Sequence, residues 1–288
     1  MVPVTRLFQL FARVPLPIMQ RVGMVLGWCV WWLSPSYRRS FKTNIKAAGI
    51  TWQQARPAIS AMGAMVGELP WVWMRPHQTL LNGLVQWDGA EHFEAAMAAG
   101  KGVIVLSPHL GSWEVGAQAI AEKFGPQHGP LIALFRPARK AWLEPLVANA
   151  RTRPYLDSAP TSLAGVRVLI RAMRAGGYTA ILPDQVPPQG QGVWAPFFGR
   201  QVYTMTLLGK LAQQTGAQVI LTWCERLPLG QGFCMHMRPL DAPELKSTDA
   251  TLEQVATVVN RAVEDLVRQA PGQYLWGYAR DKQPRTEA

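Results

Sequence analysis

The 288 residues are enough to bury a large core, as one domain or as one domain with a small appendage. A hydrophobic content of 49% against 16% charged residues is higher than in a typical soluble domain, and the net charge of +11 favours acidic partners, which could be nucleic acid, anionic lipid or an acidic carrier protein. The three cysteines, Cys29, Cys224 and Cys234, form an odd set without metal-ligand spacing, so neither a disulfide framework nor a zinc site is implied.

The first 75 residues are basic, apolar and rich in tryptophan. They contain nine Lys or Arg, six Trp and a single acid, Glu68. The segment 14–33 predicts an apolar helix whose uninterrupted part, 22–33, covers about 18 Å of a roughly 30 Å hydrocarbon core. No Ala-x-Ala cleavage site follows it. We therefore expect residues 1–34 to form an uncleaved anchor that dips into or lies on the membrane; a solvated basic face is the alternative.

The remainder, 35–288, is expected to be the functional domain. It opens with a basic, Trp-rich helical preface over 35–75, predicted as helices at 35–48 and 51–73, the first closed by Gly49. The second begins at Thr51, with Gln54 placed for a capping box, and kinks are expected in it at Pro57 and Pro70.

From residue 84 onward, predicted strands and helices alternate. Apolar runs predict strands at 84–87, 103–106, 131–135, 178–182, 218–223 and 232–238. Capped or amphipathic segments predict helices at 91–99, 113–124, 139–152, 162–175, 205–215 and 252–269. This order predicts an α/β fold with a mixed, mostly parallel central sheet flanked by helices. The stretch 190–200 is predicted as an apolar loop that plugs the core or lines a pocket for an apolar ligand.

His109 lies where the strand 103–106 ends and the next helix begins, which is where open α/β sheets place their ligands. Ser112 is the expected N-cap of that helix, and Glu114 lies in its first turn. A sharp turn would bring the Glu114 carboxylate against His109, fixing the tautomer of a general base and stabilising the imidazolium that it forms. The structural alternative is that His109 caps the strand end and Glu114 favours a helix N-terminus.

Two further strand ends carry polar residues that should meet His109 at one edge of the sheet. Arg136 follows the strand 131–135, and Asp184 and Gln185 follow the strand 178–182. Arg136 suits a phosphate, and a structural pair between Arg136 and Asp184 is the alternative. No pair of histidines has ligand spacing, so no metal site is predicted.

Five short blocks, taken together and in order, resemble the late acyltransferases of lipid A biosynthesis, within the wider His-x4-Asp/Glu glycerolipid acyltransferases. The blocks are His109-x4-Glu114, Phe135-Arg136-Pro137, Leu182-Pro183-Asp184-Gln185, Ala195-Pro196-Phe197-Phe198-Gly199 and Gln273-Tyr274-Leu275-Trp276. The resemblance covers roughly residues 5–282 and is looser over 34–75. It implies a monomeric enzyme at the cytoplasmic face of the bacterial inner membrane, held peripherally or by a single N-terminal anchor.

The same resemblance implies that a fatty acyl chain moves from acyl carrier protein, or less favourably acyl-CoA, to a hydroxyl of a lipid A precursor, without a cofactor. His109 would be the general base and Glu114 its partner, while Arg136 would contact a phosphate of acceptor or donor. Asp184 and Gln185 would scaffold the substrate site. In the apolar stretch, Phe197, Phe198 and Gly199 are expected to contact substrate. The implied partners are acyl carrier protein, anionic membrane lipid and the lipid A precursor, and no nucleic acid.

Direct transfer is the mechanism that these residues favour. His109 would remove the proton of the acceptor hydroxyl, and backbone N–H groups at Gly111 and Ser112 are the candidates for binding the oxyanion. No Gly-x-Ser-x-Gly elbow is present, which disfavours an acyl-serine, although Ser112 adjoins the motif and is the alternative nucleophile.

Three other functions remain open from the sequence. An acyltransferase of the same superfamily could act on a lysophospholipid, an ornithine lipid or a glycolipid. A module that binds membranes without catalysis is a candidate of another class. A nucleic-acid binder is suggested only by the charge, since no recognised reading element appears.

Overall fold

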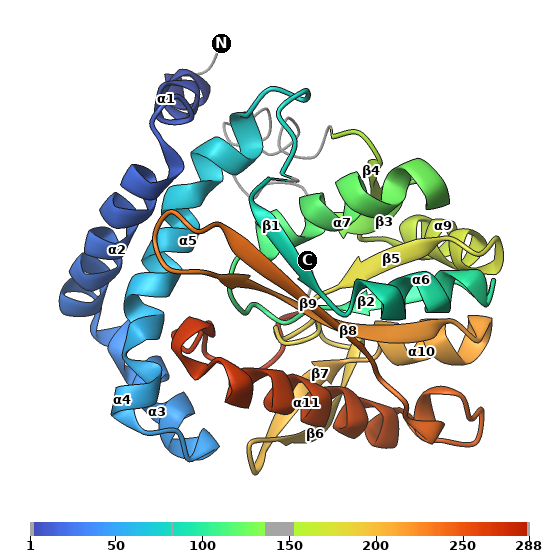
Figure 1. The fold of residues 1–288 in the computed structure, drawn as a ribbon. Helices are drawn as coiled ribbons and strands as arrows, with labels where there is room; N and C mark the ends of the chain where they lie inside the picture. Colours follow the sequence, from blue (N-terminus) through green and yellow to red (C-terminus); the bar gives the residue numbers. More distant parts are fainter. Residues whose placement is uncertain (1–2, 82, 136–152, 287–288) are drawn as a thin grey trace.

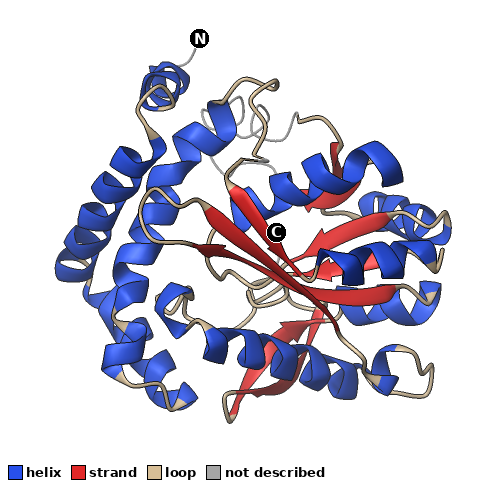
Figure 2. Ribbon diagram, viewed as in Figure 1, coloured by secondary structure: helices blue, strands red, loops and turns tan. Residues whose placement is uncertain are grey.

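A central sheet carries helices on both faces, and a stack of N-terminal helices runs along one side of it (Figures 1 and 2). The structure is a computed structural model and describes residues 3–81, 83–135 and 153–286. Its helices are α1 (Pro3–Phe11), α2 (Leu16–Leu33), α3 (Pro35–Ala48), α4 (Trp52–Ala55), α5 (Pro57–Met74), α6 (Ala90–Ala98), α7 (Trp113–His128), α9 (Leu163–Arg174), α10 (Leu207–Thr215) and α11 (Leu252–Gln269). Its strands are β1 (Val85–Asp88), β2 (Val103–Leu106), β3 (Leu131–Phe135), β4 (Leu156–Pro160), β5 (Tyr178–Ile181), β6 (Gly192–Phe197), β7 (Arg200–Met205), β8 (Gln218–Arg226) and β9 (Phe233–Pro239).

Seven of these strands form one mixed sheet in the order β1-β9-β8-β2-β5-β3-β4. All neighbouring pairs are parallel except β8 and β9, which are antiparallel. The predicted mixed, mostly parallel α/β sheet is therefore confirmed. In its middle, β2 and β5 lie side by side with Leu106 opposite Ile181, so the segments that follow these two strands leave the same edge of the sheet.

The core lies on both faces of β2, whose four residues are all buried. Ile104 and Leu106 pack toward α9, α10 and α11, whereas Val103 and Val105 pack toward α6 and α7. Alternate side chains of a strand point to opposite faces, so an uninterrupted apolar run is what a strand covered on both sides requires.

The N-terminal helix α2 packs closely on α5 through glycines. A Cβ placed on Gly23 would lie 2.2 Å from the carbonyl oxygen of Gly63, and one on Gly63 would lie 2.1 Å from that of Gly23. Gly27 and Gly67 repeat the arrangement one turn away on their helices. Glycines four residues apart on both helices let the two backbones touch, an arrangement frequent between helices in membranes.

The outer face of α1 and α2 remains apolar and exposed. It consists of Leu7, Leu10, Ile18, Val22, Val25, Leu26, Val30, Trp32 and Leu33, each more than 45% exposed. Among the described residues, α2 is the single helix long and apolar enough to cross a membrane by length and composition. Its 18 residues are about 27 Å long at 1.5 Å per residue, close to the thickness of the hydrocarbon core.

Several predicted elements need correction. The expected apolar loop at 190–200 is instead the antiparallel hairpin of β6 and β7, with its turn at Phe198 and Gly199. The predicted helix at 51–73 is two helices, α4 and α5, that meet at Pro57, one of the two expected kinks. Helix α1 and strand β4 were not predicted, and the predicted helix at 139–152 lies outside the described residues.

Candidate active site

His109 and Asp184 meet beyond the ends of the adjacent strands β2 and β5. The imidazole Nδ1 lies 2.7 Å from Asp184 Oδ1, and the backbone N–H of His109 donates to Asp184 Oδ2 at 3.0 Å. The carboxylate therefore fixes both the ring and the main chain of His109. The predicted convergence of strand-end polar residues is confirmed for this pair.

The partner of the imidazole is a different carboxylate from the predicted one. Glu114 lies in the first turn of α7 as expected, but its Oε2 accepts a hydrogen bond from Trp73 Nε1 at 3.0 Å. None of the hydrogen bonds among the described residues joins Glu114 to His109. Trp73, on α5, in turn stacks on Phe8 of α1, with ring centroids 6.0 Å apart. Glu114 thus connects α7 to the N-terminal helices, because the turn between His109 and Glu114 directs the two side chains to different partners.

The rest of the imidazole is enclosed by Gln185 and Trp113. Gln185 Nε2 lies 3.0 Å from His109 Nε2. The Trp113 ring packs edge to face against the imidazole at a centroid distance of 4.9 Å. The His109 side chain keeps 14% exposure, so it is held on three sides while solvent still reaches it.

Asp184 is held in its charged form although it is buried. Burial by itself would raise the pKa of this carboxyl, but the contacts with His109 and the charge of Arg280 outweigh burial and lower it. The Tyr274 hydroxyl also hydrogen-bonds Asp184, and burial followed by that carboxylate raises the pKa of Tyr274 well above its ordinary value. Tyr274 therefore remains a donor. Tyr274 lies in one of the five family blocks, where no role was predicted for it, and Arg280 was not among the predicted site residues.

The backbone of the turn after His109 is anchored by two distant segments. Leu275 N–H donates to the His109 carbonyl at 3.1 Å, and Gly111 N–H donates to the Gln273 carbonyl at 3.0 Å. Ser112 N–H donates to the Cys224 carbonyl at 2.8 Å. The two predicted oxyanion donors, Gly111 and Ser112, are therefore already used by the fold, which corrects that prediction.

The Ser112 side chain belongs to a buried ion-pair cluster. Its hydroxyl donates to Glu68 Oε2 at 2.7 Å and accepts from Arg226 Nη2 at 2.6 Å. Arg226 also pairs with both oxygens of Glu68, at 2.5 and 2.8 Å, and Gln20 of α2 donates to Glu68 at 2.8 Å. Ser112 occupies the N-cap position of α7, but its hydroxyl makes no capping bond. Since the hydroxyl is buried and committed at both its donor and acceptor sides, Ser112 is not available as a nucleophile.

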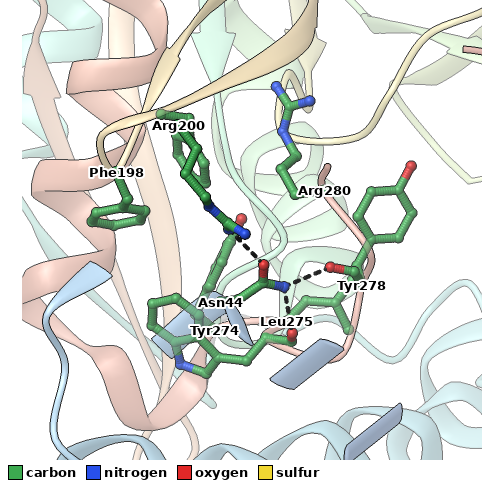
Figure 3. A pocket seen from close by; sticks show the side chains of 9 residues that line it. Asn44, Phe198, Arg200, Tyr274, Leu275, Tyr278 and Arg280 are labelled. Carbon is green, nitrogen blue, oxygen red and sulfur yellow. Dashed lines mark hydrogen bonds between the residues drawn. The ribbon is translucent and has the colours of Figure 1, made fainter. Parts of the chain in front are cut away.

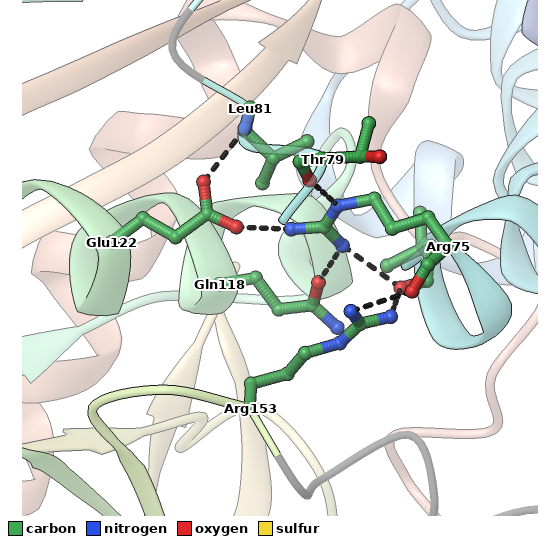
Figure 4. Close-up of polar contacts among 7 residues, drawn as sticks. Arg75, Thr79, Leu81, Gln118, Glu122 and Arg153 are labelled. Atoms are coloured by element: carbon green, nitrogen blue, oxygen red, sulfur yellow. Dashed lines mark hydrogen bonds and ion pairs between the residues drawn. The ribbon is translucent and has the colours of Figure 1, made fainter. Parts of the chain in front are cut away.

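Two buried arginines fix the C-terminal end of α5, the helix that carries Trp73 (Figure 4). Arg153 Nη1 donates to the Arg75 carbonyl at 2.8 Å, and its Nη2 donates to the Val72 carbonyl at 3.0 Å. Arg75 pairs with Glu122 of α7. Burial and the neighbouring Arg75 charge lower the pKa of Arg153 to about 10, with Glu122 opposing them. These contacts hold α5 against α7, and so keep Trp73 in reach of Glu114.

Of the remaining predicted site residues, two line a cavity, one lies in a turn and one is outside the described residues. Phe197 and Phe198 are buried and line a small cavity together with Tyr274, Trp276 and Arg280 (Figure 3). Gly199 follows in the hairpin turn with a positive φ of 72°. Arg136 lies outside the described residues.

Asn44 of α3 anchors the chain at this cavity. Its Nδ2 donates to the carbonyls of Trp276 and Tyr278, each at 2.8 Å, and its Oδ1 accepts from Arg200 (Figure 3). Among the described residues, no group of three or more His, Cys, Asp or Glu is arranged to hold a metal ion.

The chain is similar in sequence to known acyltransferases. The sequence model of the family described as bacterial lipid A biosynthesis acyltransferase matches residues 4–282. The chain is 25% identical over 285 residues to the lipid A biosynthesis lauroyltransferase of Escherichia coli K12, covering 95% of this chain and 88% of that protein. It is 26% identical to a lipid A biosynthesis acyltransferase of Haemophilus influenzae, covering 93% and 82%. A phosphatidylinositol mannoside acyltransferase of Mycobacterium tuberculosis is 26% identical, covering 51% and 46%.

Proposed function

Since the chain belongs to the bacterial lipid A biosynthesis acyltransferase family, and is by that membership an acyltransferase, we propose that it moves a fatty acyl chain from acyl carrier protein to a hydroxyl of a lipid A precursor. The observation that carries the chemistry is the contact of His109 Nδ1 with the buried, ionised Asp184 at 2.7 Å. An imidazole whose Nδ1–H is held by a carboxylate keeps the lone pair of its Nε2 for a substrate proton.

The transfer then proceeds in one cycle without an acyl-enzyme. The acceptor hydroxyl gives its proton to His109 Nε2 while its oxygen forms a bond to the thioester carbonyl carbon. The carbon–sulfur bond breaks next, and the departing thiolate takes the proton from Nε2, so the base is regenerated. Asp184 stabilises the imidazolium between the two steps. General-base catalysis of this kind supplies about 10²–10⁴-fold.

Glu114 supports the same site in a different manner. We propose that it acts by fixing Trp73, and with it the contact between α5 and α7, while Asp184 takes the part that the motif spacing suggested for Glu114. A protein of this design needs its N-terminal helices in place for full activity, because Trp73 also stacks on α1.

The exposed apolar face of α1 and α2 supports membrane association. We propose that this face lies in the cytoplasmic leaflet of the inner membrane, peripherally or as a single anchor, and that the basic residues of 1–75 other than the buried Arg75 contact anionic head groups. A second basic surface suits the acidic carrier protein. Arg167, Arg171 and Arg174 are exposed along one side of α9, which has no acidic residue.

Acyl transfer to another lipid acceptor is the second candidate. The relative named phosphatidylinositol mannoside acyltransferase favours it, because that protein shares the region matched here and its name specifies a glycolipid acceptor. The catalytic groups proposed above would serve either acceptor.

Two experiments test the proposal. Mass spectrometry of lipid A from cells with and without the gene should show one acyl chain fewer without it. The purified protein should acylate a lipid A precursor from acyl carrier protein thioesters, and His109→Ala should abolish this transfer. His128→Ala, which removes a histidine paired with Glu94 away from the site, is the matched control and should retain activity. Unchanged lipid A, with transfer to a glycolipid or lysophospholipid instead, would establish the second candidate.

A further inference from the structure

The reacting nitrogen of His109 is capped by a side-chain amide. Because Asp184 holds Nδ1–H, the neutral ring carries its lone pair on Nε2, and the Gln185 amide at 3.0 Å donates an N–H to that lone pair. The acceptor hydroxyl must hydrogen-bond the same lone pair before it loses its proton. Gln185 therefore occupies the position that the hydroxyl must take.

The backbone donors nearest to His109 are committed elsewhere. The N–H groups of His109, Leu110, Gly111 and Ser112 donate in turn to Asp184 Oδ2 and to the carbonyls of Pro108, Gln273 and Cys224, at 2.7 to 3.0 Å. An oxyanion formed beside His109 could recruit one of them only by breaking a bond that shapes the turn. A side-chain donor avoids that loss, and the Gln185 amide already contacts the base at 3.0 Å.

The backbone of Gln185 is fixed on both sides, whereas its side-chain amide is held by a hydrogen bond to His109 Nε2 that a substrate hydroxyl can replace. Asp184 before it is held by His109, and Val186 after it donates its N–H to the Tyr278 hydroxyl at 2.9 Å. The Gln185 residue itself is only partly buried. Rotation of its side chain therefore shifts the amide around a fixed point next to the imidazole.

The distances of the reaction bring the oxyanion within that reach. A hydroxyl that hydrogen-bonds Nε2 lies about 2.8 Å from it, and the thioester carbonyl carbon approaches the hydroxyl oxygen to about 3–3.5 Å before the bond forms. The carbonyl oxygen thus develops its charge next to the site that the amide vacates. A neutral amide N–H placed there stabilises the charge without altering the protonation of the base.

We propose that Gln185 is a catalytic residue with two successive partners. It donates to His109 Nε2 before the acceptor binds, and when the acceptor hydroxyl displaces it, it donates an N–H to the thioester oxygen as that oxygen becomes negative. The inference rests on the proposed acyl transfer. No proton or electron is added to the cycle, because the amide donates a hydrogen bond and transfers nothing.

The test compares Gln185→Ala and Gln185→Glu with the wild type at saturating donor. Loss of one oxyanion donor costs about 10²–10³-fold in kcat, so Gln185→Ala should fall by that factor with KM for the acceptor changed less than about threefold. Gln185→Glu keeps the size and removes the donor. The kcat of Gln185→Glu should fall by the same factor. The acid limb of its pH–rate profile should move to higher pH, because a carboxylate beside the ring favours the imidazolium. The shifted limb shows only that residue 185 contacts the ring; a residue that merely shapes the loop would leave kcat of the equally sized Gln185→Glu close to that of the wild type.

Two further readouts keep the result separate from the choice of acceptor. Hydrolysis of the acyl thioester uses water in place of the lipid hydroxyl, so it measures the oxyanion step even if lipid A precursors prove to be the wrong acceptors. The nitrogen NMR signal of His109 Nε2, assigned with His109→Ala, should shift in Gln185→Ala because a hydrogen bond is lost. Thermal melting identifies a variant that does not fold. If Gln185→Ala does not fold, the wild type is compared with Gln185→Glu alone.

The outcomes divide cleanly. A wild type that hydrolyses the thioester but acylates no lipid A precursor refutes the proposed acceptor and leaves the Gln185 comparison intact. Folded Gln185 variants with wild-type kcat overturn the present inference, because the oxyanion step then does not depend on this amide. Loss of kcat in both variants, with the shifted limb in Gln185→Glu, supports it.

Discussion

Replacing Asp184 by Asn should cost most of the activity, because the two oxygens of this carboxylate have separate tasks. Oδ2 accepts from the His109 backbone and Oδ1 faces Nδ1. An Asn side chain has one oxygen and one NH₂ group. If the oxygen stays on the fixed backbone N–H, the NH₂ group donates to Nδ1 and forces the ring proton onto Nε2, where the lone pair of the base is needed.

The expected magnitude follows from the charge and the distance. Coulomb's law at 2.7 Å with an effective dielectric constant of about 20 gives about 6 kcal/mol between Asp184 and an imidazolium. Loss of general-base catalysis by 10²–10⁴-fold corresponds to about 2.7–5.5 kcal/mol of transition-state free energy. The two figures agree in order, so we expect kcat of Asp184→Asn to fall by about 10²–10⁴-fold.

The assay is the steady-state rate of transfer from acyl carrier protein thioester to a lipid A precursor, with thermal melting to confirm folding. Glu114→Gln is the matched control, since it alters a carboxylate that is hydrogen-bonded to Trp73 and not to the base. We expect its loss of kcat to be smaller than that of Asp184→Asn. If Asp184→Asn retains most of the wild-type rate while Glu114→Gln loses it, the structure-based assignment of the partner carboxylate is wrong.

Three further predictions concern stability. Gly63→Ala should lower the free energy of unfolding and detach α2 from α5, because its Cβ would lie 2.1 Å from a backbone oxygen of α2. Gly83→Ala has open space around it and should leave the free energy of unfolding unchanged in the same denaturant titration. Glu68→Ala should cost about 3–5 kcal/mol by leaving its buried arginine partner uncompensated, against little change for the exposed Glu91→Ala, as measured by urea unfolding. The pKa of Asp184 is lower in the folded state than the ordinary 3.8. The ionised carboxylate therefore stabilises the fold above pH 3.8, and this contribution is lost as the pH falls through the folded pKa. The melting temperatures of wild type and Asp184→Asn should converge in acid.

The sheet could be predicted where burial leaves a plain signal. Strand β2 is at its predicted position because a strand covered on both faces must be apolar throughout, and β3 lies where its apolar run predicted it. Strand β4 was missed because it lies at the edge of the sheet and contains Asp157 and Ser158, both exposed. The β6–β7 hairpin was missed because its glycines and aromatic residues suggested a loop, and its pairing is visible only between the two strands.

The candidate site could likewise be predicted only where the signal is local in the sequence. His109 and Asp184 could each be placed at a strand end from the local sequence, and the adjacency of β2 and β5 then brought them together. The pairing itself was assigned to Glu114, because spacing along the chain favours a near neighbour over a residue 75 positions away. Tyr274 and Arg280 approach Asp184 only through the return of the C-terminal segment to the sheet edge, for which the sequence carries no local signal.

Chemical rescue of His109→Gly by imidazole in the acyl-transfer assay tests whether the His109 ring is the general base. If the ring of His109 lifts the proton of the acceptor hydroxyl, the variant should lose about 10²–10⁴-fold in rate, and added imidazole should restore part of the rate in proportion to its concentration. A folded His109→Gly protein that transfers the acyl chain at the wild-type rate without imidazole would show that His109 is not the general base.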